Sequence, residues 1–288
     1  MIEVDVTADL ARALLADQHP DLAHLPLHGR THGWDNLTWR LGSDLALRLP
    51  VRELSSTLVA REHRWLPELA PRLPVPVPVP VRHGAPGRGY PWTWSVVPWL
   101  PGDVVAASDP TTRTPWAHEL AEALAALHAP APAAAPSNPY RGVAPASRDD
   151  VVAARLAGDL PHADALRDAW RAGLAAAPWR GAPVWVHGDP HPGNLVTSGC
   201  HLTGLLDFGD LCAGDPASDL ATAWMTFDPA GRAAFVARTQ QLRGWDDATW
   251  VRARGWAAAL VHPLLAHPEA YPLMAAVGRF TASQVALG

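Results

Sequence analysis

The stretch that decides the fold reads VWVHGDPHPGNLVTSGCHLTGLLDFGDLCAGDPASD and spans residues 184–219. Its first three residues, Val184–Val186, are apolar and predict a short buried strand. Two prolines and two glycines follow within residues 187–194, and they exclude a helix or a strand there. Asp189 and Asn194 are therefore expected on a rigid, irregular loop.

The rest of this stretch predicts a short hairpin that returns a third polar residue to the loop. Apolar residues flank a turn at Ser198-Gly199, and the second arm ends at Asp207. Phosphoryl transfer needs a carboxylate that orients the hydroxyl nucleophile, and oxygen ligands that hold Mg²⁺ beside the phosphates. Asp189, Asn194 and Asp207 supply these groups, so the stretch indicates phosphoryl-transfer chemistry.

The two motifs HGDPHPGN (187–194) and DFGD (207–210) together resemble the catalytic loop and metal-binding segment of the aminoglycoside phosphotransferase family. This family is a branch of the protein-kinase-like fold. The resemblance implies that Asp189 is the catalytic base, that Asn194 and Asp207 are Mg²⁺ ligands, and that ATP or GTP is the donor. Either motif alone can arise from ordinary turn residues, but both in this order at kinase spacing favour the resemblance.

Four further residues of the stretch are candidates for supporting roles. Asp210 follows the metal segment and is a candidate to face the substrate. His191 is a candidate substrate-binding residue that either approaches phosphate or caps a turn. His187 is expected to buttress the loop. Asp219 is expected to be structural, accepting backbone N–H groups or capping a helix.

Strand patterns in the first third and helical patterns in the rest predict an α+β, bilobal protein-kinase-like fold. We expect a small strand-rich N-lobe that binds nucleotide, residues 1–98, and a larger helical C-lobe with the catalytic and substrate-binding groups, residues 99–288. The predicted strands are 25–28, 37–41, 45–49 and 91–100, and the predicted helices are 7–18, 59–70, 114–128, 149–157, 163–176, 215–225, 231–241, 247–260 and 273–286.

The nucleotide side of the site is expected in the N-lobe. Kinases place a lysine on the third strand, paired with a helix glutamate. This chain contains no lysine, and Arg48 occupies that place, with Glu62 as its partner on the next helix. Without the later motifs, both would be read as ordinary solvated residues. In kinases the segment that joins the two lobes binds the purine, and the order of elements along the chain places it here at Val97, Pro98, Trp99 and Leu100. The glycine-rich phosphate loop of kinases is not matched, because Gly29 and Gly33 do not form a G-x-G-x-x-G pattern.

Composition excludes several other classes of protein. The net charge of −5 shows no basic excess for nucleic acid, and no apolar run of membrane-spanning length occurs. The N-terminus lacks the pattern of a signal peptide. Only two cysteines are present, which fits a reducing cytoplasm. We therefore expect a cytoplasmic protein with neither a nucleic-acid partner nor a membrane partner, while the choice of monomer or dimer stays open.

The resemblance implies a Mg²⁺-dependent kinase that phosphorylates a hydroxyl of an antibiotic and confers resistance. The resemblance puts aminoglycosides first, then basic cyclic peptides and macrolides. A count of charges adds to it, because residues 184–288 carry nine acidic side chains against six arginines and an acidic cleft would attract a polycation. Two alternatives remain: a metabolite kinase for homoserine, choline or a sugar, and a nucleotide-binding pseudokinase. The sequence leaves open which antibiotic, which hydroxyl, and whether ATP or GTP is used.

Overall fold

The computed structural model describes residues 3–288, which form two compact units. The first unit holds the chain up to Pro71, then Pro76–Leu100 and Asp207–Gly209. The second holds Arg72–Val75, Pro101–Leu206 and Asp210–Gly288. The functions assigned to the two predicted lobes stay predictions.

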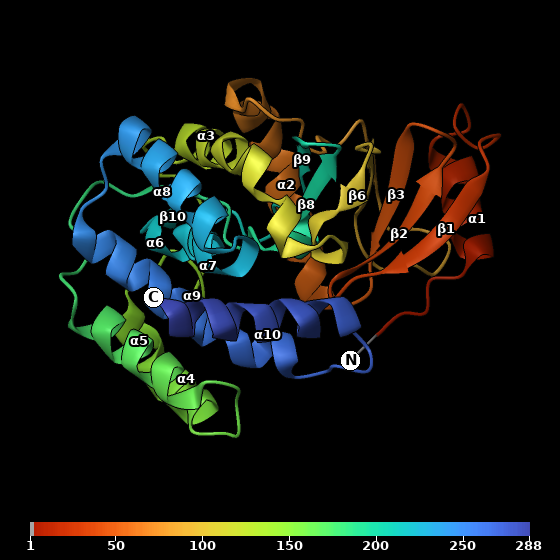
Figure 1. The fold of residues 1–288 in the computed structure, drawn as a ribbon. Helices are drawn as coiled ribbons and strands as arrows, with labels where there is room; N and C mark the ends of the chain where they lie inside the picture. Colours follow the sequence, from red (N-terminus) through yellow and green to blue (C-terminus); the bar gives the residue numbers. More distant parts are fainter. Residues whose placement is uncertain (1–2) are drawn as a thin grey trace. The chain divides into compact units, whose positions relative to one another are not determined.

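The first unit is built on a five-stranded antiparallel sheet with the strand order β1-β2-β3-β5-β4. Two helices pack on this sheet (Figure 1). The elements are α1 (Ala8–Gln18), β1 (Leu27–His32), β2 (Asn36–Leu41), β3 (Leu45–Pro50), α2 (Glu53–Leu69), η1 (Ala70–Arg72), β4 (Arg82–Gly84) and β5 (Trp94–Pro98).

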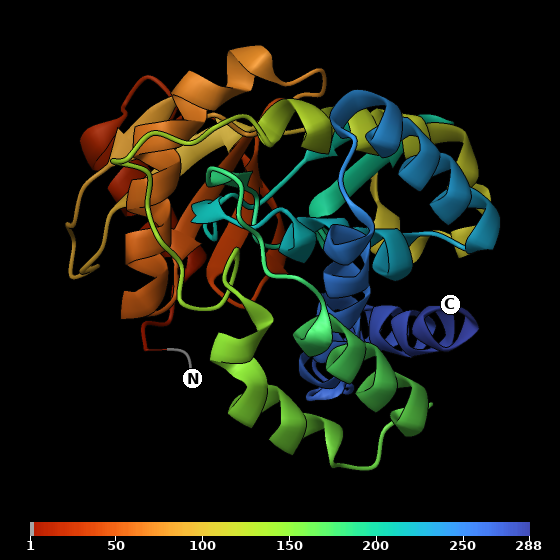
Figure 2. The same cartoon turned by 90° about the vertical axis from the view of Figure 1, so that its left-hand side faces the viewer.

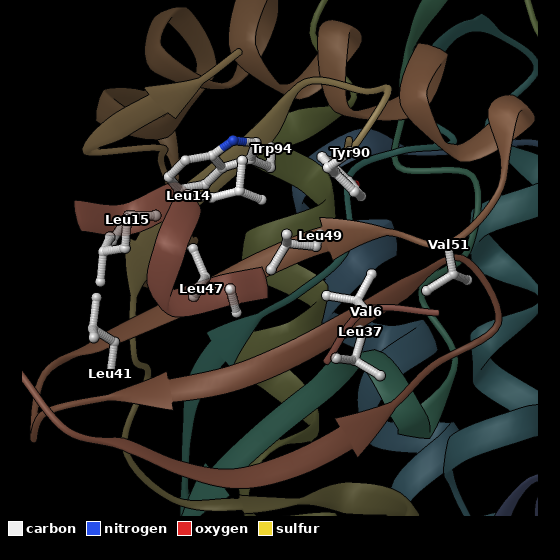
Figure 3. Packing of buried hydrophobic residues seen from close by; sticks show 12 residues of the cluster. Val6, Leu14, Leu15, Leu37, Leu41, Leu47, Leu49, Val51, Tyr90 and Trp94 are labelled. Atoms are coloured by element: carbon white, nitrogen blue, oxygen red, sulfur yellow. The ribbon is translucent and has the colours of Figure 1, made fainter. Parts of the chain in front are cut away.

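Strand β3 is covered on both faces, because its side chains alternate between two helices. Leu47 and Leu49 join Leu14 of α1 and Trp94 in a buried apolar cluster (Figure 3). Arg48 lies between these two leucines in the chain, so it faces away from the cluster. The sequence pattern thereby leaves one charged side chain on the α2 side of a buried strand.

The second unit is mostly helical, as predicted. Its helices are η2 (Val105–Ala107), η3 (Pro110–Thr112), η4 (Thr114–Trp116), α3 (Ala117–Leu127), η5 (Pro145–Arg148), α4 (Asp149–Leu156), α5 (Ala163–Ala175), η6 (Pro192–Asn194), α6 (Ala217–Leu220), α7 (Thr222–Thr226), α8 (Pro229–Arg243), α9 (Asp247–Leu265) and α10 (Pro272–Leu287). Helices α9 and α10 lie side by side (Figures 1 and 2). Helix α5 approaches α9 closely, because Gly173 and Gly255 face each other without side chains between them.

Two small sheets contain the strands of the stretch 184–219. Strand β7 (Val184–Val186) pairs antiparallel with β10 (Cys212–Gly214). Strands β8 (Leu195–Ser198) and β9 (His201–Leu205) form the predicted hairpin, and β6 (Asp103–Val104) pairs with β8. The strand before the catalytic loop and the hairpin after it are therefore confirmed. Over residues 3–288, no helix combines the length and apolar character needed to cross a membrane.

The fold class is confirmed, while several element boundaries differ from the prediction. Strand β1 extends to His32 through a bulge at Gly29, whose φ is +42°. It carries no apolar alternation because most of it is exposed at the sheet edge. Helix α2 begins at Glu53, ahead of its apolar stripe. The helix predicted over 215–225 is broken between α6 and α7 at Ala221.

Candidate active site

The catalytic loop is held at its start by the carboxylate of Asp219, which is fully buried. Its two oxygens accept hydrogen bonds from the backbone N–H groups of His187, at 2.7 Å, and Gly188, at 2.9 Å. The Nε2–H of His128 donates a third bond at 3.0 Å. The predicted structural role of Asp219 is confirmed by these contacts.

His187 braces the loop from inside, as predicted. Its Nδ1 accepts a hydrogen bond from the backbone N–H of Asp189 at 3.2 Å, so its Nε2 carries the proton and donates to the Leu206 carbonyl at 3.0 Å. Burial lowers the pKa of His187 below its ordinary value, even though nearby carboxylates such as Asp219 oppose this shift. A neutral imidazole with a fixed tautomer therefore supports the loop.

The two motifs come into contact at Gly188 and Asp210. Gly188 has a φ of +93°, and a Cβ there would lie 2.6 Å from the Asp210 carbonyl oxygen. Only glycine combines this backbone conformation with so close an approach. The glycine of HGD thus allows the loop to pass directly over the residue that follows DFG.

Asp189 is held by one arginine and one histidine. Arg141 Nη2 lies 3.1 Å from its Oδ1, and His191 Nε2 lies 3.3 Å from its Oδ2. The Nδ1 of His191 accepts from the Gly193 N–H, which places the ring proton on the Nε2 that faces Asp189. Burial alone would raise the pKa of Asp189, but His191 and Arg141 outweigh it and hold the pKa below the ordinary carboxyl value. The carboxylate is ionised and keeps 27% of its side-chain surface exposed.

Asp210 is tied to the same arginine. Its Oδ2 lies 3.7 Å from Arg141 Nε, and its Oδ1 accepts from Asn138 Nδ2 at 2.8 Å. Sequence reasoning missed both Asn138 and Arg141. They lie after an Ala/Pro-rich connection that carries neither a periodic pattern nor a motif, so no signal in the sequence pointed to them.

The predicted ion pair between Arg48 and Glu62 is present in the first unit. Arg48 Nη1 donates to both Glu62 oxygens, at 2.9 and 3.2 Å, and Glu62 also accepts from the Phe208 N–H at 2.9 Å. Arg48 Nη2 lies 3.7 Å from Asp207 Oδ1. Burial would lower the pKa of Arg48, but Glu62 and Asp207 outweigh it and raise the pKa above its ordinary value. Arg48 thus joins the helix α2 glutamate to the DFG aspartate.

Asp207 adopts a left-handed backbone conformation, with a φ of +58°. Such a conformation is costly for a residue other than glycine and persists only where the surroundings enforce it. The hydrogen bond from the Phe208 N–H to buried Glu62 fixes the next peptide, and Phe208 itself is fully buried. The Asp207 side chain nevertheless keeps 41% of its surface exposed.

The predicted purine-binding segment forms the end of β5 and the residues after it. Val97 is buried, while Pro98, Trp99 and Leu100 are half-buried. The Trp99 N–H donates to the Asp44 carbonyl at 2.8 Å. This amide is therefore engaged within the unit, and the purine-binding role of the segment stays a prediction.

The predicted Mg²⁺ ligands have suitable donor chemistry. Asn194 Nδ2 donates to the Asp189 carbonyl at 2.9 Å, so the amide oxygen is the end directed away from the loop. This oxygen and the exposed carboxylate of Asp207 are hard ligands of the kind that Mg²⁺ prefers. Within residues 3–288, no group of three or more His, Cys, Asp or Glu side chains could hold a metal ion by itself.

The acidic residues of the motif stretch are largely neutralised by arginines. Asp189 pairs with Arg141, and Asp215 forms a buried pair with Arg252 at 2.8 Å. Asp219 is enclosed by hydrogen-bond donors. The excess of acidic residues counted from the sequence therefore does not by itself make an acidic surface.

The chain matches the model of the phosphotransferase enzyme family over residues 26–256. The chain belongs to this family. No curated protein matches this phosphotransferase in sequence.

Solved structures of related enzymes share the fold of this phosphotransferase. The GDP complex of wild-type aminoglycoside 2'-phosphotransferase-IIIa has a TM-score of 0.69 at 17% identity, over 96% of this chain and 97% of that one. A macrolide 2'-phosphotransferase from Brachybacterium faecium has a TM-score of 0.62 at 24% identity, over 96% and 98%. A type I macrolide 2'-phosphotransferase has a TM-score of 0.61 at 23% identity, over 98% of each chain.

The contacts of Arg48 generate a testable prediction about nucleotide binding. Arg48→Ala should raise the nucleotide KM and lower kcat, on the order of tenfold to a hundredfold together, since a hydrogen bond to a charged group contributes about 1.5–3 kcal/mol. Arg48→Lys should recover only part of the loss, because an ammonium group cannot reproduce the planar fork. Steady-state kinetics at saturating acceptor measure both effects.

A double-mutant cycle with Glu62→Ala supplies the control for this prediction. The two substitutions should be non-additive, with a coupling of about 0.5–3 kcal/mol. Arg64 and Glu68 form an exposed pair on the same helix, and Arg64→Ala should leave the nucleotide KM unchanged. Wild-type kinetics for Arg48→Ala, or simple additivity of the two substitutions, would exclude a role of Arg48 in binding the nucleotide phosphates.

Proposed function

We propose that this phosphotransferase is a Mg²⁺-dependent kinase that transfers the γ-phosphoryl group of ATP or GTP to a hydroxyl of an antibiotic and thereby inactivates it. The observation that carries the proposal is the Asp189 carboxylate. It lies on a loop braced by Asp219 and His187, it is kept ionised, and it retains exposed surface. Membership of the phosphotransferase family supports the reaction class.

In this proposal Asp189 accepts a hydrogen bond from the acceptor hydroxyl. The acceptor oxygen forms a bond to the γ-phosphorus, the bond from phosphorus to the β–γ bridging oxygen breaks, and the nucleoside diphosphate leaves. The hydroxyl proton passes to Asp189. Because the pKa of Asp189 is low, the carboxylate is a weak base, so it chiefly orients the hydroxyl and receives the proton late.

The donor nucleotide would be held by groups of the first unit. The guanidinium of Arg48 would face the phosphates, with Glu62 fixing its orientation, and the 97–100 backbone would bind the purine. Asn194 and Asp207 would hold Mg²⁺, which neutralises charge on the phosphates when it is bound. His191 and Asp210 would lie toward the acceptor.

The proposed acceptor is an aminoglycoside, a macrolide or a basic cyclic peptide. Solved structures with the same fold include enzymes for the first two classes, among them a kanamycin complex. The pairing of Asp189 and Asp210 with Arg141 neutralises part of their charge and so weakens the charge argument for a polycation over a macrolide with a single amine. All three classes therefore belong in one test.

Substitution of Asp189 tests the proposed base. Asp189→Ala should lower kcat by about 10²–10⁴, the usual contribution of a positioned proton acceptor, while nucleotide affinity changes little. Turnover of the purified variant and calorimetric titration with a nucleotide analogue measure the two quantities. A variant with wild-type turnover would contradict the proposal.

Removal of the Asp207 carboxylate tests the metal assignment. Asp207→Ala should abolish turnover and weaken nucleotide binding only when Mg²⁺ is present, because the carboxylate would act through the metal. Nucleotide affinity is measured with Mg²⁺ and with excess chelator. A variant that keeps the wild-type dependence on Mg²⁺ would show that Asp207 is not a ligand.

Expression in a susceptible bacterium tests the substrate class. The wild-type gene should raise tolerance to at least one of kanamycin, erythromycin or viomycin, and the Asp189→Ala gene should not. Mass spectrometry of the drug should show one added phosphate. No protection against any of the three, together with phosphorylation of homoserine, choline or a sugar, would replace the antibiotic proposal with a metabolite kinase.

A further inference from the structure

Residues 136–142 form a segment that is fixed along strand β10. The Pro136 carbonyl accepts from the Ala213 N–H at 2.9 Å, and the Gly142 carbonyl accepts from the Asp215 N–H at 2.9 Å. The Gly142 N–H donates to Ser218 Oγ at 3.1 Å. Both ends of the segment are thus bound to the chain that follows the DFGD motif.

The close fit at Gly142 explains how the segment can lie so near β10. Gly142 has a φ of +65°, and a Cβ there would lie 3.2 Å from the Cα of Gly214. A Cβ on Gly214 would lie 2.1 Å from the Gly142 carbonyl oxygen. Two glycines therefore allow two backbones to meet, and the side chain of Arg141 starts from a fixed point.

From this point Arg141 reaches both catalytic motifs. Its Nη2 lies 3.1 Å from Asp189 Oδ1 in the loop, and its Nε lies 3.7 Å from Asp210 Oδ2 after DFG. Asn138, from the same segment, donates to the side chain of Asp210 at 2.8 Å and to its carbonyl at 3.3 Å. The segment thus supplies one cation and one amide to a pair of carboxylates.

We propose that Arg141 is a positioning residue for the phosphoryl acceptor, because its guanidinium spans Asp189 and Asp210 and fixes the direction in which Asp189 presents its carboxylate. This inference rests on the proposed function of Asp189. A planar guanidinium has N–H groups in a rigid fork, so contact with two carboxylates restricts the rotation of both. His191 holds the other oxygen of Asp189, which leaves the carboxylate one orientation.

The guanidinium also makes it possible for two anions to lie together. Asp189 and Asp210 would repel each other without a cation between them. With Arg141 absent, Asp189 would be free to turn toward other donors, and the acceptor hydroxyl would meet a carboxylate in several orientations. Loss of orientation of this kind costs on the order of 10²-fold in rate.

Arg141→Gln tests this proposal, with Arg148→Gln as its matched control. Arg148 lies near the same segment and stacks on Tyr140, with its guanidinium carbon 4.9 Å from the ring centre. Arg141→Gln should lower kcat at saturating acceptor by about 10²-fold and change the nucleotide KM by less than about twofold. Arg148→Gln should keep the wild-type kcat. Arg141→Lys should recover part of the loss, because the charge stays while the fork is lost.

A second comparison separates positioning from a general effect on folding. In an Asp189→Asn background, Arg141→Gln should add little further loss, because both substitutions disable the same group. Melting temperatures of all variants should match that of Arg148→Gln. Any of three results would overturn the proposal: a wild-type kcat for Arg141→Gln, a loss of activity that comes from a raised nucleotide KM, or full additivity in the double variant.

Failure of the proposed function gives a different result. If the wild-type chain transfers no phosphoryl group to any antibiotic or metabolite tested, the role of Asp189 fails and the role of Arg141 fails with it. If the wild type is active and Arg141→Gln equals it, only the positioning role is excluded.

Discussion

The carboxylate of Asp219 lies without solvent exposure and accepts hydrogen bonds from the backbone of His187 and Gly188 and from the ring of His128. A buried carboxylate is costly unless every oxygen is paired, so each of these donors has to stay in place. Asp219 lies in α6, while His187 directly follows strand β7 and His128 directly follows helix α3, so this one group joins the ends of three elements. The catalytic loop therefore has a fixed start, and the position of Asp189 follows from it.

Glu62 fixes the backbone of the DFGD motif in the way that Asp219 fixes the catalytic loop. It is buried, it accepts from Arg48, and it accepts from the N–H of Phe208, which follows Asp207. In both motifs a helix carboxylate binds the backbone beside a functional aspartate, while the aspartate itself keeps exposed surface. Buried polar groups thus fix each loop, while one carboxylate beside them keeps part of its surface exposed.

The sequence predicted those parts of the site that are defined by spacing along the chain. These parts follow from local patterns in the sequence. They are the spacing of Asp189 and Asn194 along the chain, the hairpin that leads to Asp207, and the alternation that leaves Arg48 among apolar neighbours. Arg141 could not be predicted, because its contacts depend on a segment held to β10 by backbone hydrogen bonds and by two glycines that meet in space. The count of charges over residues 184–288 did not show how these residues pair, because Arg141 lies outside that range and the contact of Arg252 with Asp215 depends on the fold.

In the proposed function, this chain transfers a phosphoryl group to a hydroxyl through Asp189. Nucleotide labelled at the γ-phosphorus, incubated with Mg²⁺ and with kanamycin, erythromycin or viomycin, measures this directly. We expect the label to appear as a phosphate ester of at least one drug with the wild-type protein, and we expect Asp189→Ala to lose nearly all of this transfer. Label that stays in the nucleotide or appears only as inorganic phosphate, or equal transfer by Asp189→Ala, would contradict the account.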